Sequence, residues 1–165
     1  MDRDTKLRYF GEGESVSIGY VSGPYELLRA IDETMPKDAT LYVEGASIVR
    51  EIKDFLVSRQ TESPREIESG TTWPRPKTFH MPLEGTNLAE LRALADHQAG
   101  PGVCDTLVVY RDDEVLLWAH DAGYGYVDVA PSVPAETTER LRVALGAALT
   151  KRKPAGLLGR LFSRA

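Results

Sequence analysis

Three short apolar runs in this chain each break at a small or hydroxyl-bearing residue, and an amphipathic helical pattern follows at once. The clearest copy is residues 41–47, LYVEGAS, which lead into a helix expected over about 48–59. Strands that alternate with helices are typical of α/β folds, in which the helices pack on a sheet. The sequence therefore predicts an α/β fold whose first half contains three strand-helix units.

Length and composition predict one domain. The chain has 165 residues, of which 42% are hydrophobic and 27% charged, as in ordinary globular proteins. Such a chain can bury one substantial core, so we expect a single domain over 1–150 and a tail over 151–165. Residues 1–15 are polar, no apolar run reaches transmembrane length, and Cys104 is the only cysteine, which predicts a protein of the reducing cytoplasm.

Hydrophobic spacing places the elements of the first half. A strand is expected over 16–21, and Pro24 then suits the first turn of a helix because its missing N–H needs no partner there. A second strand is expected over 41–44, after which the Ser47 hydroxyl is positioned to cap the next helix. A third strand is expected over 78–83. Because a connection of a dozen or more residues permits parallel pairing, we expect these three strands to run parallel.

The second half has a different pattern. Asn87 and Glu90 have the spacing of a capping box at the start of a helix. Two apolar runs, 107–110 and 115–119, flank a short charged turn and predict an antiparallel hairpin. A strand over 126–129 and a helix over 134–149 are expected to follow. We therefore predict a mixed sheet that ends in an antiparallel β-meander and a C-terminal helix.

Residues 60–77 form a long connection that is polar and rich in proline. Connections of this length without periodicity are uncommon in compact domains and are either functional or poorly ordered. Trp73 is the one large aromatic residue in it. Its side chain is a candidate partner-binding anchor, and the alternatives are a lid over a ligand or packing on the domain itself.

The body of the chain and its C-terminal tail carry opposite net charges. Of the 20 lysines and arginines, five lie in residues 151–165 and none of the 25 acidic residues does, so residues 1–150 carry a net charge of −10. An acidic body repels phosphate backbones, so no nucleic-acid partner is expected. In the tail, Leu157, Leu158, Leu161 and Phe162 share one helical face beside basic residues. We take Leu158, Leu161 and Phe162 as candidate partner-binding residues, with a membrane surface as the alternative.

Standard catalytic and metal-binding motifs are absent from the sequence. No phosphate-binding loop, dinucleotide fingerprint, nucleophile elbow or zinc-protease motif is present. The three histidines, His80, His97 and His120, stand in separate elements, so we expect no metal and no cofactor. Cys104 has an acidic neighbour, Asp105, which disfavours a reactive thiolate, and we expect an inert thiol.

A common rim of loops is the remaining candidate site. If the first three strands are parallel, the loops after them meet at one edge, where α/β proteins place ligands. These loops supply the candidate ligand-binding residues Ser22, Gly23, Gly45, Ser47, Thr86 and Asn87. The weak catalytic candidates are Glu44, Ser47 and His120, although each loop residue also has a structural explanation as a cap or turn.

Two functions follow from these observations. The first is a non-enzymatic protein-interaction module that binds a protein partner or a second copy of itself. The alternative is a small-molecule binding protein or small enzyme that uses the loops at the ends of the parallel strands. A perturbed pKa on Glu44 or His120 inside a concave pocket would favour the alternative.

Overall fold

The computed structural model describes residues 6–10, 15–19, 23–62, 64–70, 75–122 and 125–146, and structural statements below refer to these ranges. Its centre is a six-stranded sheet with the order β2-β8-β7-β6-β3-β5. These strands are β2 (Val16–Ile18), β3 (Thr40–Gly45), β5 (Lys77–Pro82), β6 (Thr106–Arg111), β7 (Glu114–His120) and β8 (Val127–Val129). A separate parallel pair is formed by β1 (Leu7–Arg8) and β4 (Ile67–Glu68).

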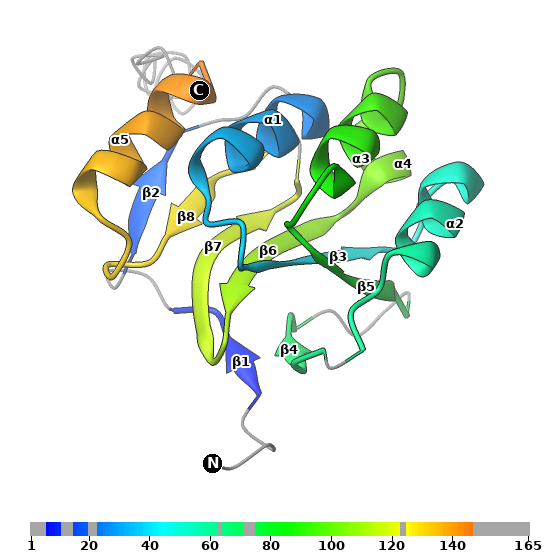
Figure 1. Ribbon diagram of the computed structural model, residues 1–165, viewed down its shortest axis with the longest axis horizontal. Helices are drawn as coiled ribbons and strands as arrows, with labels where there is room; N and C mark the ends of the chain where they lie inside the picture. Colours follow the sequence, from blue (N-terminus) through cyan, green and yellow to red (C-terminus); the bar gives the residue numbers. More distant parts are fainter. Residues whose placement is uncertain are drawn as a thin grey trace, which may run out of the picture.

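The helices lie on one face of the six-stranded sheet, whereas β1 and β4 lie on the other side (Figure 1). The helices are α1 (Pro24–Thr34), α2 (Arg50–Ser58), α3 (Asn87–Ala95), α4 (Gly100–Val103) and α5 (Ala135–Ala144). Along the sheet, α1 lies between α5 and α3, and it contacts both. The predicted mixed α/β class is thereby confirmed.

The prediction of parallel neighbouring strands is wrong. All pairings within the six-stranded sheet are antiparallel, including those of β3 with β5 and with β6. Strands β2 and β3 do run in the same sense, but β8, β7 and β6 lie between them. The long connection after β3 brings the chain back beside β3 in the opposite direction, because a crossover of that length permits either sense.

Local sequence signals account for most helix boundaries but not all of them. Pro24 lies in the first turn of α1, as predicted. Ser47 is exposed and does not cap α2, because that helix begins later, at Arg50, with Val49 as its N-cap residue. At α3 the N-cap residue is Thr86 rather than Asn87, and the Thr86 hydroxyl donates to Glu90. The observed N-cap residues therefore lie two residues after the predicted one at α2 and one residue before it at α3.

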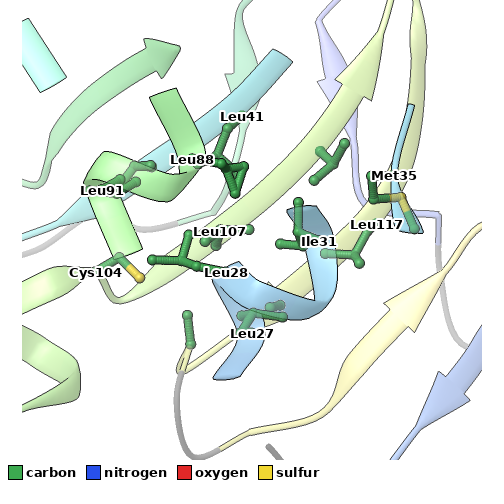
Figure 2. Packing of buried hydrophobic residues seen from close by; sticks show 14 of the residues in the cluster. Leu27, Leu28, Ile31, Met35, Leu41, Leu88, Leu91, Cys104, Leu107 and Leu117 are labelled. Carbon is green, nitrogen blue, oxygen red and sulfur yellow. The ribbon is translucent and has the colours of Figure 1, made fainter. Parts of the chain in front are cut away.

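The main core lies between the helices and the sheet. Apolar residues at helical spacing on α1 point onto the strands, where they meet strand residues of one parity and the inner face of α3 (Figure 2). This cluster includes Leu27, Leu28, Ile31, Met35, Leu41, Leu88, Leu91, Leu107 and Leu117. Burial of this face is what holds the helical layer in place.

The opposite face of the sheet carries a second, more aromatic cluster. Residues of β3, β6 and β7, together with Leu7 of β1, form it, and its buried members are Leu7, Tyr42, Val108, Tyr110, Val115 and Trp118. A register shift between Val109 and Tyr110 interrupts the alternation opposite β7, so that Val115 and Trp118 share this face. Tyr9, Phe10 and Ile67 pack against it. We call residues 6–10 and 64–70 the β1–β4 cover, because they lie over this face.

The predicted hairpin and the strand after it agree with the structure, whereas α5 ends at Ala144, before the predicted end at 149, and Gly146 takes a positive φ of 61°. Strands β6 and β7 form the predicted hairpin, whose turn includes Asp112 at a positive φ of 52°. Part of the long connection is ordered, since it contributes β4 and its Thr61 N–H donates to the His80 carbonyl oxygen at 2.8 Å. Trp73 and the whole tail, 151–165, lie outside the described residues.

Candidate functional site

Two of the three catalytic candidates, Glu44 and His120, lie in one cross-strand row on the face of the sheet beneath the β1–β4 cover, which we call the second face. Glu44 on β3 is in register with Thr106 on β6, which is in register with His120 on β7. One strand therefore separates Glu44 from His120, which places their Cα atoms roughly 10 Å apart. The Glu44 carboxylate is almost fully buried, at 1% exposure, and accepts a hydrogen bond from the Tyr42 hydroxyl. His120 is exposed at the end of its strand.

Next to this row on the same face, polar side chains of β3, β5 and β6 hydrogen bond to one another or to the backbone. His80 on β5 contacts the Tyr110 hydroxyl through Nδ1 at 3.0 Å, and Tyr110 also accepts from the Arg65 backbone N–H. Burial lowers the pKa of His80 to about 4, so the ring is neutral at physiological pH. Burial, and secondly the Glu44 carboxylate, raise the pKa of Tyr42, which therefore stays protonated as the donor. These side chains serve the packing of the second face.

Tyr9 attaches the β1–β4 cover to this face. Its hydroxyl donates to the Asp128 carboxylate at 2.8 Å. Its ring lies edge-on to Trp118 and His120, at centroid distances of 5.6 and 5.1 Å. Trp118 Nε1 in turn donates to His120 Nδ1 at 3.3 Å, so the His120 ring is oriented by the aromatic cluster. The sequence analysis missed this role, for which the only signal was the alternation of Leu7 and Tyr9.

The common rim of loops does not exist in the structure. Gly45 is in register with Lys77 at the start of β5, whereas Thr40 is in register with Pro82 at its end. The loop with Gly85, Thr86 and Asn87 is therefore at the opposite end of the sheet from Gly45 and Ser47. Gly23 lies at the Gly45 end, because β2 runs in the same sense as β3, and Ser22 is outside the described residues.

Packing explains Gly45 without a ligand. A Cβ atom at this position would lie 2.8 Å from the Ile48 side chain, so only glycine lets the following loop fold this closely onto the strand. The Asp105 carboxylate fixes the same loop by accepting from the Ala46 N–H at 2.8 Å. Ser47 lies exposed on this loop.

The loop at the other end lines an open polar groove of about 530 Å³. Its lining residues are Arg59, Gln60, Pro82, Glu84, Gly85, Thr86 and Asn87. Thr86 donates to Glu90, and the Asn87 side-chain amide donates to the Pro82 carbonyl oxygen at 3.0 Å. Arg59 pairs with Glu90 at 3.1 Å. Thr86 and Asn87 thus hold the turn that precedes α3, and Arg59 links α2 to α3.

A site that the sequence analysis missed lies between α1 and α5. One hollow of about 260 Å³ is lined by Glu33, Thr34, Glu139, Arg140, Val143 and Ala144. A second hollow of about 310 Å³ is lined by Thr34, Met35, Pro36, Arg111, Glu114, Leu116, Ser132, Val133, Pro134 and Thr137. Thr34 belongs to both, so the two hollows adjoin along α5, and we call them together the α1–α5 groove.

Apolar groups line the α1–α5 groove. Val143 on α5 is 68% exposed, the largest value among the large hydrophobic residues described as exposed. In the second hollow, Met35, Leu116 and Val133 supply apolar surface. The sequence contains little sign of this groove, because Val143 stands beside Arg142 and outside the apolar stripe of the helix, which contains Leu141, Ala144 and Leu145.

Some of the charged side chains at the groove have hydrogen-bond or ion-pair partners, and others do not. The Arg140 guanidinium donates to the Glu33 carbonyl oxygen at 2.8 Å, and Arg111 pairs with Asp38 at 3.7 Å. Within the described part of the chain, the exposed carboxylates of Glu114 and Glu136 form no ion pair. Glu114 lines the second hollow and Glu136 is on α5 outside both hollows, whereas Arg140 in the first hollow forms no ion pair among the described residues. A basic partner is therefore favoured at the Glu114 end of the groove.

Other chemistry in the described ranges is limited. No group of three histidine, cysteine or acidic side chains lies close enough there to hold a metal ion, and no described helix has the length and apolar character needed to cross a bilayer. Cys104 is buried, and burial, with a smaller contribution from Asp105, raises the pKa of its thiol to about 12. The predicted partner-binding residues Trp73, Leu158, Leu161 and Phe162 lie outside the described residues.

No protein-family model, curated protein or solved structure matches this chain.

Proposed function

We propose that this protein is a non-enzymatic interaction module of the cytoplasm that binds a segment of another polypeptide in the α1–α5 groove. The observation that carries the proposal is the exposure of Val143, at 68%, beside hollows lined by Met35, Leu116 and Val133. An exposed aliphatic side chain next to an apolar depression can be covered by apolar side chains of a partner. Val57 is comparably placed on its helix, at 51% exposure, but lines none of the three hollows described above.

The dimensions of the groove favour side-chain anchors over a small molecule. Small-molecule sites usually enclose about 300–1,000 Å³ and bury most of the ligand. The first hollow, at about 260 Å³, lies below that range, and the second, at about 310 Å³, lies at its lower end. Val143 lines only the first hollow, so an elongated segment whose side chains enter both hollows covers Val143 together with Met35, Leu116 and Val133.

The hydrogen bonds of the second face support a non-enzymatic role. Glu44, the buried carboxylate, accepts from Tyr42, and the neutral His80 contacts Tyr110. The loops expected to carry a ligand lie at opposite ends of the sheet. The partner we propose therefore presents leucine-like side chains, with lysine or arginine nearby to pair with Glu114 and Glu136.

The test compares two matched valine substitutions on exposed helix faces. Val143→Asp places a charge in the groove, whereas Val57→Asp makes the same change on α2, away from it. Proteins captured from a native extract by the wild-type chain are quantified against both variants. We expect at least one captured protein to fall at least ten-fold with Val143→Asp and to be unchanged with Val57→Asp. Equal recovery with all three chains would contradict the proposed surface.

A further inference from the structure

We infer that the polypeptide segment seated in the α1–α5 groove is the chain's own C-terminal segment, residues 151–165, which an external partner must displace. This inference rests on the proposed function, since it names the occupant of the same groove. The segment lies outside the described residues, and its sequence, its reach and the chemistry of the groove point to this occupant.

The segment has the chemistry that the groove favours. Its apolar side chains, Leu157, Leu158, Leu161 and Phe162, recur at helical spacing on one face. Its five basic residues are accompanied by no acid. The groove offers apolar depressions, the exposed Val143 and the Glu114 carboxylate, which, like that of Glu136 on the adjoining face of α5, forms no ion pair within the described ranges. Both the apolar and the charged parts of the segment would therefore find complementary groups.

The segment can also reach the groove. α5 ends at Ala144 and the described chain ends at Gly146, beside the first hollow, so about ten residues separate this point from Leu157. A chain of about ten residues extends at most ~35 Å. A helix of the length of α5 is only ~15 Å long, and the groove follows α5 from Pro134 to Ala144. The apolar face can thus lie over either hollow.

Because the segment belongs to the same chain as the groove, it is favoured there over a separate peptide. A segment joined by a short connection has an effective concentration in the millimolar range. A free peptide with the same contacts would therefore have to reach millimolar concentrations to compete with the attached segment. A short helix is marginal in water alone, so the groove would also supply the burial that such a helix needs.

The test measures competition in the full-length chain. A fluorescently labelled peptide with the sequence of residues 151–165 is titrated, with anisotropy as the readout, into the wild-type chain and into a chain carrying Leu158→Asp and Leu161→Asp. We expect at least ten-fold tighter binding to the substituted chain, because its own segment no longer occupies the groove. Adding Val143→Asp to that chain should weaken binding at least ten-fold, and adding Val57→Asp should leave it unchanged.

Several outcomes would overturn the inference. Equal affinity for the wild-type and substituted chains, or no detectable binding to either, would show that the segment does not occupy this groove. A dimer in sedimentation of the wild-type chain that Leu158→Asp and Leu161→Asp dissolve would assign the segment to a second copy. Binding to phosphatidylserine vesicles that the same substitutions abolish would assign it to a membrane surface. In all these cases, loss of a captured partner on Val143→Asp would still support the proposed function.

Discussion

At the scale of single residues, the second face of the sheet shows how burial decides what a polar side chain can do. His80 lies on an edge strand, yet it is only 9% exposed, because the Tyr42 and Tyr110 rings lie edge-on to its own ring and the Thr61 N–H donates to its carbonyl oxygen. Its pKa is lowered to about 4 by that burial. A histidine that stays neutral in the folded chain but can take a proton in the unfolded chain makes stability depend on pH.

Acid should destabilise the protein through His80. Between the folded pKa of about 4 and an unfolded value near 6.5, the unfolded chain binds the extra proton. The contribution is therefore fully present above about pH 6.5 and is lost as the pH falls to about 4. At about 1.4 kcal/mol per pKa unit, the loss is up to ~3 kcal/mol. Urea unfolding at several pH values measures it.

The control is a second histidine in a different environment. His97 has a side chain that is 88% exposed. The fall in stability between pH 7 and pH 4.5 should be smaller in His80→Gln than in the wild-type chain, and it should be the same in His97→Gln as in the wild type. An equal pH dependence in the wild type and His80→Gln would show that the His80 ring is not held neutral.

At the scale of elements, the β1–β4 cover is held by few contacts. Each of its strands is two residues long, and the pairing joins Leu7 to Ile67 and Arg8 to Glu68. Strands this short are not stable alone. The cover therefore depends on anchors that reach the main sheet, and Tyr9 is the anchor with both a hydrogen bond and ring contacts.

Removal of the Tyr9 hydroxyl should loosen the cover and spare the helical layer. Tyr9→Phe deletes the hydrogen bond to Asp128, a carboxylate that is only 8% exposed. Hydrogen bonds to charged groups contribute about 1.5–3 kcal/mol. We expect a loss of about that size and faster amide exchange in residues 6–10 and 64–70. Tyr25→Phe on α1, whose hydroxyl has no described hydrogen bond, should cost less than ~0.5 kcal/mol.

At the scale of the whole molecule, the two hydrophobic clusters share the strands of one sheet. Leu41 and Val43 face the helices, whereas Tyr42, between them on β3, faces the cover. Because β3, β6 and β7 each contribute residues to both clusters, neither cluster can lose its strands without disrupting the other. The molecule should therefore unfold as one unit.

A core substitution on one face should thus be detected on the other. Leu28→Ala, at a fully buried position of α1, should lower the free energy of unfolding by about 2–5 kcal/mol. In a Trp73→Phe background Trp118 is the only tryptophan, and it lies on the face opposite Leu28. Urea transitions followed by its fluorescence and by far-UV circular dichroism should shift together. Separate midpoints would show that the cover side unfolds independently.

The sequence patterns predicted elements better than their assembly. Pro24 in the first turn of α1 and the charged turn between β6 and β7 are local signals, and both elements form where they were expected. The direction of β5 beside β3 is not local, because the connection between them is long enough for either sense. Because β5 runs antiparallel to β3, the expected common rim of loops does not form. Thr86 and Asn87 lie instead at the opposite end of the sheet from Gly45.

By itself, the sequence determined the mixed α/β class, the helical faces and the hairpin, because spacing and turn chemistry act over a few residues. It also determined the charge of the C-terminal segment, on which the proposed contact with the groove depends. Only the tertiary structure decided that Glu44 and His120 share a row and that α1 and α5 enclose a groove. Strand order and helix placement result from contacts between residues distant in sequence, which no local pattern specifies.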